Sequence, residues 1–244
     1  MSDRRLTPAN GRVACASLRG RVAAARFVAG EECRVTVPVA DLLSAPEGAR
    51  DRQLLLGAAV RVFEHRDGWA FVQAAADGYV GYVRAGALAP VRDPVPTHRV
   101  AVRATHLYPR PEVTAPASLA LSHGSRLAVT DGADTGGEAG GDGRFARVSG
   151  GFVPRAHLAP LDRPDADPVT VAERLIGTPY LWGGNSAFGI DCSGLVQAAL
   201  GACDVPCPGD SDLQAGLGVA AEGPPRRGDL LFWKGHVALV ADPA

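Results

Sequence analysis

One cysteine stands where a helix is predicted to begin, a position at which a thiol can become a nucleophile. Cys192 follows Asp191, and the apolar residues after it recur at helical spacing: Leu195, Ala198, Ala199 and Cys203. Unpaired backbone N–H groups and the positive dipole end in the first turn of a helix stabilise a thiolate. The sequence therefore predicts Cys192 as a nucleophile. The alternative is a small buried core thiol, the common state of a free cysteine.

A histidine further along the chain could supply the base. Residues 228–240 read GDLLFWKGHVALV, two apolar β-type runs divided by Lys234 and Gly235, with His236 opening the second run. An imidazole fixed on a strand beside a helix N-terminus matches the Cys/His arrangement of a papain-like site. We therefore expect His236 to accept the thiol proton. A strand histidine with a structural role is the alternative.

The other cysteines and histidines do not form a second site. Cys203 and Cys207 form a C-x₃-C pair without a nearby Cys/His pair, so neither a metal nor a cofactor is expected. Five cysteines, an odd number without regular spacing, predict reduced thiols rather than a disulfide framework. Surface or structural roles are expected for the histidines of the β-rich segments: His65, His98, His106, His123 and His157.

Composition excludes several classes of partner. Lys and Arg number 25 against 26 for Asp and Glu, a net charge of −1, so no overall field attracts phosphate backbones or anionic lipid. We therefore expect no nucleic acid and no membrane among its partners. The sequence has no apolar run long enough to span a bilayer and no apolar secretory segment at its start, which predicts a cytoplasmic protein. The 30 Gly and 19 Pro exceed average usage and favour a turn-rich, strand-rich architecture.

Two β-rich segments precede the reactive region and repeat one another. Short runs with period-two alternation, punctuated by Gly and Asp, fill residues 35–92, and residues 97–161 repeat the pattern. The corresponding pieces are Pro46-Glu47 with Pro111-Glu112, 57–62 with 124–129, and AGALAP with RAHLAP. A glycine-rich insertion on a turn, 131–143, accounts for the drift in spacing. Two tandem small antiparallel β-barrels are the predicted structure.

The remaining segments flank these repeats. Residues 1–34 form a polar, Arg- and Ala-rich N-terminal extension, and residues 162–168, rich in Pro and Asp, form a linker. Residues 169–244 begin a different kind of domain with a short helix, for which Gly177 is a plausible C-terminal residue. We therefore predict an α+β fold in which a papain-like C-terminal catalytic domain follows two small antiparallel β-barrels.

Two resemblances to known families refine these expectations. The ending DGW…GYVGYV of the first repeat resembles the bacterial Src-homology-3-like modules that accompany cell-wall peptidases; a generic small barrel is the alternative. Residues 169–242 resemble the NlpC-type cysteine peptidase family of bacterial cell-wall hydrolases. The elements that carry this second resemblance are Tyr180, Trp182, Gly183 and Gly184; 191–196; Ser211 and Gln214; 228–233; and 235–237.

The NlpC-type resemblance implies a function. Such enzymes hydrolyse amide bonds in peptidoglycan stem peptides, usually between γ-D-glutamate and a diamino acid such as diaminopimelate. Cys192 would be the nucleophile and His236 the general base, with the Cys192 N–H as oxyanion donor, assisted by Tyr180. The implied substrate-binding residues are Tyr180, Trp182, Asp191, Ser193 and, on a weaker basis, Glu64. A muropeptide of wall turnover or recycling is the implied substrate.

One departure from the family pattern leaves other functions open. Relatives carry a third polar residue on the strand after the histidine, whereas this sequence ends eight residues after His236, at Ala244. Asp242 lies six residues further along, about 20 Å of extended strand, and is too distant to orient the imidazole. Either the given sequence stops short of the third residue, or the orienting group comes from elsewhere in the chain, or activity is impaired. A catalytically impaired muropeptide-binding protein is therefore one alternative, and a Cys/His acyltransferase or amidase is another.

Overall fold

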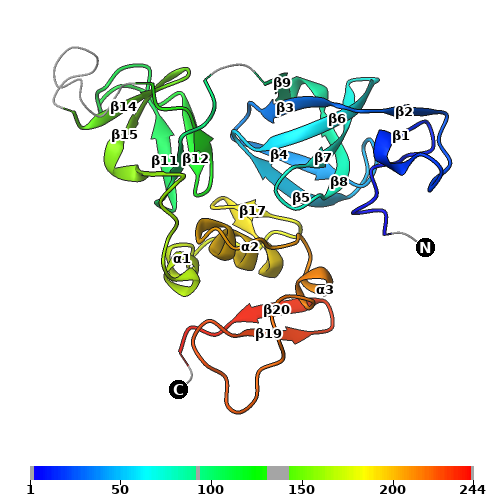
Figure 1. Ribbon diagram of the computed structural model, residues 1–244. Helices are drawn as coiled ribbons and strands as arrows, with labels where there is room; N and C mark the ends of the chain where they lie inside the picture. Colours follow the sequence, from blue (N-terminus) through cyan, green and yellow to red (C-terminus); the bar gives the residue numbers. More distant parts are fainter. Residues whose placement is uncertain (1–2, 92–93, 131–142, 243–244) are drawn as a thin grey trace. The chain divides into compact units, whose positions relative to one another are not determined.

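The computed structural model describes residues 3–91, 94–130 and 143–242, and the chain forms two compact units, Met1–Arg92 and Asp93–Ala244. Each unit is built mostly from antiparallel strands, and the α-helices of the described part lie in the second unit (Figure 1). None of the described helices is both long and apolar enough to cross a bilayer.

The first unit is organised around one seven-stranded sheet. Its strands are β3 (Glu31–Val35), β4 (Val39–Leu43), β5 (Arg50–Leu55), β6 (Ala59–Arg66), β7 (Trp69–Ala74), β8 (Val80–Arg84) and β9 (Leu88–Pro90). The spatial order is β5-β4-β8-β7-β6-β3-β9, and every pairing is antiparallel. No pairing joins β5 to β9 among the described residues, so the closed barrel expected for residues 35–92 is not shown. The first strand of the sheet begins at Glu31, inside the segment predicted as an extension.

Both faces of the central strand β7 are covered. Ala70, Val72 and Ala74 point into one core cluster, while Phe71 belongs to a second cluster on the other face. A β-bulge between Val62 and Glu64 shifts the register of β6 against β7. The second cluster is completed by Val13, which is fully buried. The N-terminal segment, with its parallel strands β1 (Val13–Cys15) and β2 (Arg26–Val28), is therefore part of the first unit's core.

The second repeat forms smaller sheets in the second unit. The strands are β10 (His98–Val100), β11 (Ala104–Leu107), β12 (Leu119–Ser122), β13 (Arg126–Leu127), β14 (Phe145–Val148), β15 (Gly151–Pro154) and β16 (Leu158–Pro160). They pair as β13-β10-β16, β11-β12 and β14-β15, and no closed barrel is found in the described part of this segment. The predicted insertion at 131–143 lies outside the described residues, except for Gly143.

The ends of the two repeats share one local structure. In the first unit a 3₁₀ turn, Ala85–Ala87, leads into β9, which pairs with β3. In the second unit the 3₁₀ turn Arg155–His157 leads into β16, which pairs with β10. The AGALAP and RAHLAP segments therefore have equivalent places in their sheets.

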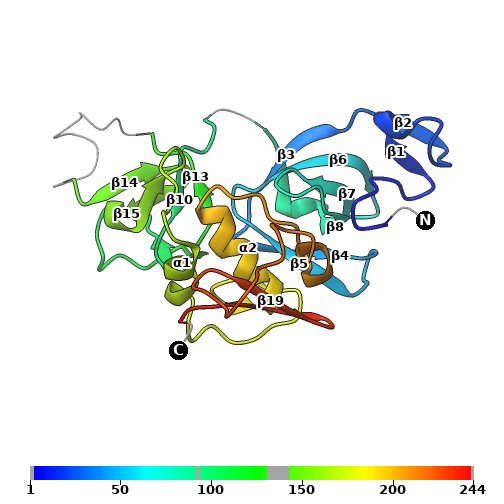
Figure 2. The same ribbon diagram turned by 60° about the horizontal axis from the view of Figure 1, so that its bottom comes forward.

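The last part of the chain places two helices and a hairpin together. The elements are α1 (Pro168–Arg174), β17 (Asn185–Ser186), β18 (Gly189–Ile190), α2 (Cys192–Ala202), α3 (Ser211–Gln214), β19 (Leu230–Trp233) and β20 (His236–Leu239). Helix α2 packs against both α1 and the β19–β20 hairpin, and both views show it next to these elements (Figures 1 and 2). One small apolar cluster joins α2 to α1 through Val171 and Ala199, and another joins α2 to β20 through Val196 and Val237.

The predicted linker is tied to its surroundings. The Asp165 carboxylate accepts hydrogen bonds from Arg99 at 2.9 Å and from Arg174 at 2.7 Å. Asp167 is the N-cap of α1, where it accepts from the N–H groups of Val169 and Thr170, and Pro168 is the first helical residue. Residues 162–168 thus connect β16 to α1 through specific polar contacts.

Candidate active site

Cys192 is the first residue of α2, as the spacing predicts, and Asp191 is the N-cap. One Asp191 carboxylate oxygen accepts from the Gly194 N–H at 2.7 Å and from the Ser193 hydroxyl at 3.0 Å. The other accepts from the Gly183 N–H at 2.9 Å. One carboxylate therefore caps the helix and also holds the glycine-rich loop that precedes it. These bonds fix the backbone on both sides of the Cys192 thiol.

The loop before Cys192 packs tightly on the first turn of α2. Gly184 donates to the Leu181 carbonyl at 2.8 Å, and its own carbonyl accepts from the Asp191 N–H at 3.1 Å. A Cβ at Gly194 would lie well inside van der Waals contact with the Gly184 carbonyl oxygen, so only glycine allows this approach. Gly183 has a φ of +69°, a left-handed conformation that also favours glycine. The Trp-Gly-Gly and Asp-Cys-Ser-Gly segments thus form one structural unit.

Tyr180 and Trp182 are the aromatic residues of this loop. Tyr180 forms an isolated bridge with Ile190, two residues before Cys192. Its ring is 62% exposed, and Trp182 is 70% exposed. Partial burial raises the pKa of Tyr180, and negative charge at Cys192 and Asp191 acts in the same direction. The phenol therefore stays a hydrogen-bond donor beside the thiol at neutral pH.

His236 opens β20, as the sequence predicts, and its side chain is exposed. It is the cross-strand partner of Trp233 on β19, and the two ring centroids lie 5.9 Å apart with the planes tilted by 38°. Its neighbour Val237 is buried in a cluster against which Cys192 also packs. The structure therefore brings the strand that carries His236 to the helix that carries Cys192.

The thiol and the imidazole are not hydrogen-bonded. Among the described residues, no hydrogen bond joins Cys192 to His236, and no polar side chain orients the His236 ring. Asp242 is exposed and makes no such contact. Catalytic hydrogen bonds are often long in the absence of substrate and tighten when it binds. The pairing of Cys192 with His236 stays a prediction.

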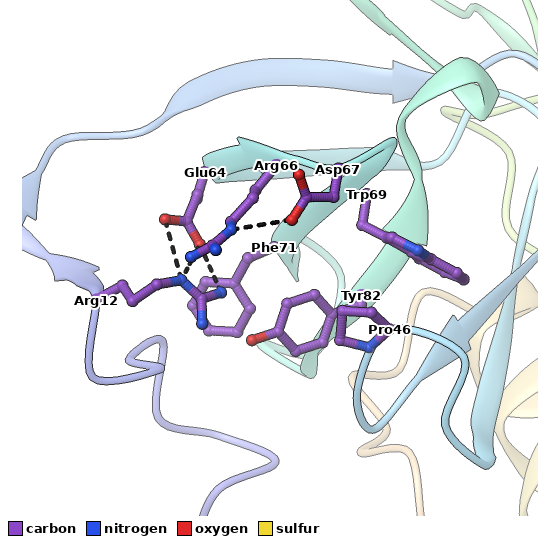
Figure 3. Close-up of a pocket in the computed structure, with 8 residues that line it drawn as sticks. All are labelled: Arg12, Pro46, Glu64, Arg66, Asp67, Trp69, Phe71 and Tyr82. Carbon is purple, nitrogen blue, oxygen red and sulfur yellow. Dashed lines mark hydrogen bonds and ion pairs between the residues drawn. The ribbon is translucent and has the colours of Figure 1, made fainter.

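Glu64, the weakest predicted site residue, lies in the first unit on β6. Its carboxylate accepts from Arg12 at 2.8 Å and from Asn10 at 3.2 Å, and these contacts hold the pKa of Glu64 below its usual value. Glu64 and Arg12 line a cavity of about 240 Å³ (Figure 3). The other lining residues are Pro46, Arg66, Asp67, Trp69, Phe71 and Tyr82. A role of Glu64 toward substrate stays a prediction.

Sequence reasoning assigned no role to one buried residue beside the nucleophile. Gln214 of α3 is fully buried, and its amide donates to the Ser193 carbonyl at 3.0 Å and to the Pro208 carbonyl at 2.9 Å. The Ser…Gln pattern marked the residue but could not show its partner, which lies 21 positions away in the chain. Within the described residues, no group of three His, Cys, Asp or Glu side chains could hold a metal ion.

Comparison with known proteins agrees with this arrangement at the level of domains. Residues 177–242 match the NlpC/P60 family, and residues 42–88 match the bacterial dipeptidyl-peptidase SH3 domain. A crystal structure of an NlpC/P60 family protein from Bacillus cereus superposes with a TM-score of 0.72. The match covers 86% of this chain and 88% of that one at 22% sequence identity, so it shows a shared fold.

Curated relatives are similar to this chain over shorter stretches. A γ-D-glutamyl-L-lysine dipeptidyl-peptidase of Bacillus cereus is 36% identical over 81 residues, which are 31% of this chain and 24% of the relative. Dipeptidyl-peptidase 6 of Lysinibacillus sphaericus is 44% identical over 73 residues, which are 29% of this chain and 27% of the relative. The chain thus spans about a quarter of the relatives it matches. It contains an NlpC/P60 domain and a bacterial SH3-type domain, and its relatives are peptidases.

Proposed function

We propose that this protein is a cysteine peptidase that hydrolyses the bond between γ-D-glutamate and a diamino acid in peptidoglycan stem peptides. The observation that carries the proposal is Cys192 at the first position of α2, capped by Asp191, inside the segment that matches the NlpC/P60 family. The relative from Bacillus cereus is named for a γ-D-glutamyl-L-lysine bond, which supports this substrate class. A cytoplasmic location and a role in wall recycling stay predictions from the sequence.

The proposed reaction uses the thiol and the imidazole in two steps. Cys192 Sγ attacks the γ-carbonyl carbon of D-glutamate while His236 takes the thiol proton, and the same proton then goes to the departing amine. The resulting thioester is hydrolysed by a water that His236 deprotonates. The Cys192 N–H at the start of α2 would stabilise the oxyanion of each tetrahedral intermediate, with the neutral Tyr180 phenol as a second donor.

Asp191 and Ser193 remain the proposed binding residues for the substrate's free amino group. A carboxylate has about four acceptor sites, and Asp191 uses three of them for Gly183, Gly194 and Ser193. One acceptor site therefore remains for an ammonium group. Trp182 is exposed beside the loop and is proposed as an apolar wall of the cleft.

The two-module organisation of the N-terminal part is also a proposal. One SH3-type domain is matched at residues 42–88. The shared ending of the repeats, a 3₁₀ turn followed by a strand paired with the first strand of its sheet, supports residues 97–161 as a second, divergent copy. We propose the predicted boundaries of the modules and of the peptidase domain on the same basis.

A peptide-release assay tests the proposed activity. The full chain is incubated with L-Ala-γ-D-Glu-diaminopimelate and, separately, with the L-lysine analogue, and released L-Ala-D-Glu is measured by mass spectrometry. Release by wild type, loss in Cys192→Ala and retention in Cys203→Ala are expected. No release from either peptide would overturn the proposal, and so would full activity of Cys192→Ala.

A muropeptide-binding protein without catalysis is a second candidate. The missing hydrogen bond between Cys192 and His236 favours it. The rate of iodoacetamide alkylation at pH 6 separates the two candidates, because burial raises the pKa of Cys203, which therefore reacts slowly and serves as an internal reference. Faster labelling of Cys192 supports the enzyme, and equal labelling supports the binding protein.

A further inference from the structure

We infer that Gln214 is a positioning residue for the nucleophile, an inference that rests on the proposed function. Gln214 ends α3, a four-residue helix, and has no exposed surface. Its Nε2 donates to the carbonyls of Ser193 and Pro208 and lies 3.4 Å from Cys207 Sγ. The two hydrogens of the amide match the two carbonyls, which fixes the side chain in one orientation.

The contact with Ser193 acts on the peptide group between Ser193 and Gly194, the two residues that follow Cys192. The carbonyl of Ser193 and the N–H of Gly194 belong to the same planar peptide group. Gln214 binds the carbonyl at 3.0 Å, and Asp191 binds the N–H at 2.7 Å. The Ser193–Gly194 peptide group, one residue beyond the nucleophile, is thus held at both ends, by side chains from opposite directions along the chain.

This arrangement limits how the first turn of α2 can move. The first turn of a helix has N–H groups without intrahelical partners and frays easily. Rotation of the Ser193–Gly194 peptide would break the bonds to Gln214 and Asp191 together, and it would release the side chain of the N-cap residue that directly precedes Cys192. The placement of a reacting group to within about 1 Å can change a rate by about 100-fold. The buried amide therefore keeps the thiol and the oxyanion donor in a fixed relation.

A second glutamine provides a matched comparison. Gln197, one turn further along α2, donates to the Cys207 carbonyl at 2.9 Å and accepts from Asn185 at 3.2 Å. It binds the same 207–208 segment as Gln214 through the Cys207 carbonyl, whereas the Ser193 carbonyl is bound by Gln214. Loss of its amide should loosen the loop without releasing the first turn of α2.

The test compares Gln214→Met with Gln197→Met. Both changes keep the length of the side chain and remove its hydrogen bonds. For Gln214→Met we expect iodoacetamide labelling of Cys192 at pH 6 to slow by about 10-fold, and kcat for the stem peptide to fall by about 10- to 100-fold with KM changed by less than about threefold. For Gln197→Met we expect both rates within about twofold of wild type. Equal effects of the two changes, or no slowing of labelling in a folded Gln214→Met, would overturn the inference.

Two further measurements keep the outcomes distinct. If Gln214→Met does not fold, Gln214→Glu replaces it: burial favours the neutral acid, which keeps one donor. An intermediate labelling rate then supports the inference, and a wild-type rate overturns it. Labelling does not depend on peptide hydrolysis, so a wild type without peptidase activity defeats the proposed function while the labelling comparison still decides the role of Gln214.

Discussion

Two glycines of α2 make it possible to measure the packing of the catalytic loop on the nucleophile's helix. Replacing glycine by alanine inside a helix gains up to about 1 kcal/mol of stability from helix propensity. At Gly201 the added Cβ meets no atom within 4 Å, so Gly201→Ala should be stabilised by about 0.5–1 kcal/mol. At Gly194 the same Cβ collides with the Gly184 carbonyl oxygen and lies 3.1 Å from Asn185 Nδ2 and 3.2 Å from Asp191 Oδ1.

The collision at Gly194 is with backbone, which cannot rotate away as the end of a flexible side chain can. Inserting atoms into a packed region costs about 1–3 kcal/mol, and a backbone collision belongs near the upper end. Both changes gain the same kind of helix propensity. The difference in unfolding free energy between Gly194→Ala and Gly201→Ala therefore measures the cost of the collision. We expect a difference of about 2–3 kcal/mol in unfolding free energy, which corresponds to roughly 4–12 °C in Tm for a unit of this size.

Scanning calorimetry of the two variants and the wild type measures this difference. The order of Tm should be Gly201→Ala, wild type, Gly194→Ala, and labelling of Cys192 should slow only in Gly194→Ala. A Gly194→Ala protein as stable as Gly201→Ala would show that the loop at 183–191 does not pack on the first turn of α2, and the reasoning about the site would be wrong.

Three further predictions concern charged and titratable groups. Asp191→Ala should lower the unfolding free energy by about 2 kcal/mol, the upper end for loss of an N-cap. Asp191→Asn should lower it less, because the amide oxygen can still cap the helix but cannot also accept from Gly183. Equal Tm values for wild type and Asp191→Ala would contradict this prediction. Burial, together with the nearby positive charge of Arg174, lowers the pKa of His123. Near and below pH 6.5 the folded state therefore binds fewer protons than the unfolded state. The unfolding free energy should consequently fall as pH drops below about 6.5. Urea unfolding at several pH values should show this slope in wild type and a weaker one in His123→Gln; identical slopes would exclude the effect. Asp165→Asn should lower the unfolding free energy by about 3 kcal/mol, because the nearly buried Arg99 loses its counter-ion. A urea midpoint within the error of wild type would show that this ion pair does not contribute to stability.

Local signals predicted the reactive segment well. The Asp-Cys-Ser-Gly run predicted a helix start, and Asp191 is its N-cap, because capping depends only on residues two or three positions away. The Lys234-Gly235 break between two apolar runs predicted His236 at the start of a strand, which the structure has. Gly177 has a φ of +87°, but it lies two residues after the Leu175 C-cap of α1, one position later than the predicted C′ site.

Contacts between distant residues could not be read from these patterns. Val13 lies in a segment that resembles a polar extension, yet it is fully buried against Phe63 and Phe71 because the bulge in β6 leaves an apolar face on the sheet. The buried position of Gln214 likewise depends on how α3 meets α2. The sequence also predicted two closed barrels from strand-like repeats, but alternation specifies strands and their faces, not which edges pair.

The two halves of the proposed catalytic pair are held differently. Around Cys192, the carboxylate of Asp191 and the amide of Gln214 hold one peptide group from both ends. His236 lies on a two-stranded hairpin, and its ring contacts the ring of Trp233. The buried side chain of Val237 packs this hairpin against α2. Rotation of the imidazole costs few contacts, whereas movement of the backbone around Cys192 breaks several hydrogen bonds. Formation of the Cys192–His236 bond therefore depends on the imidazole reaching a nucleophile that is already in place.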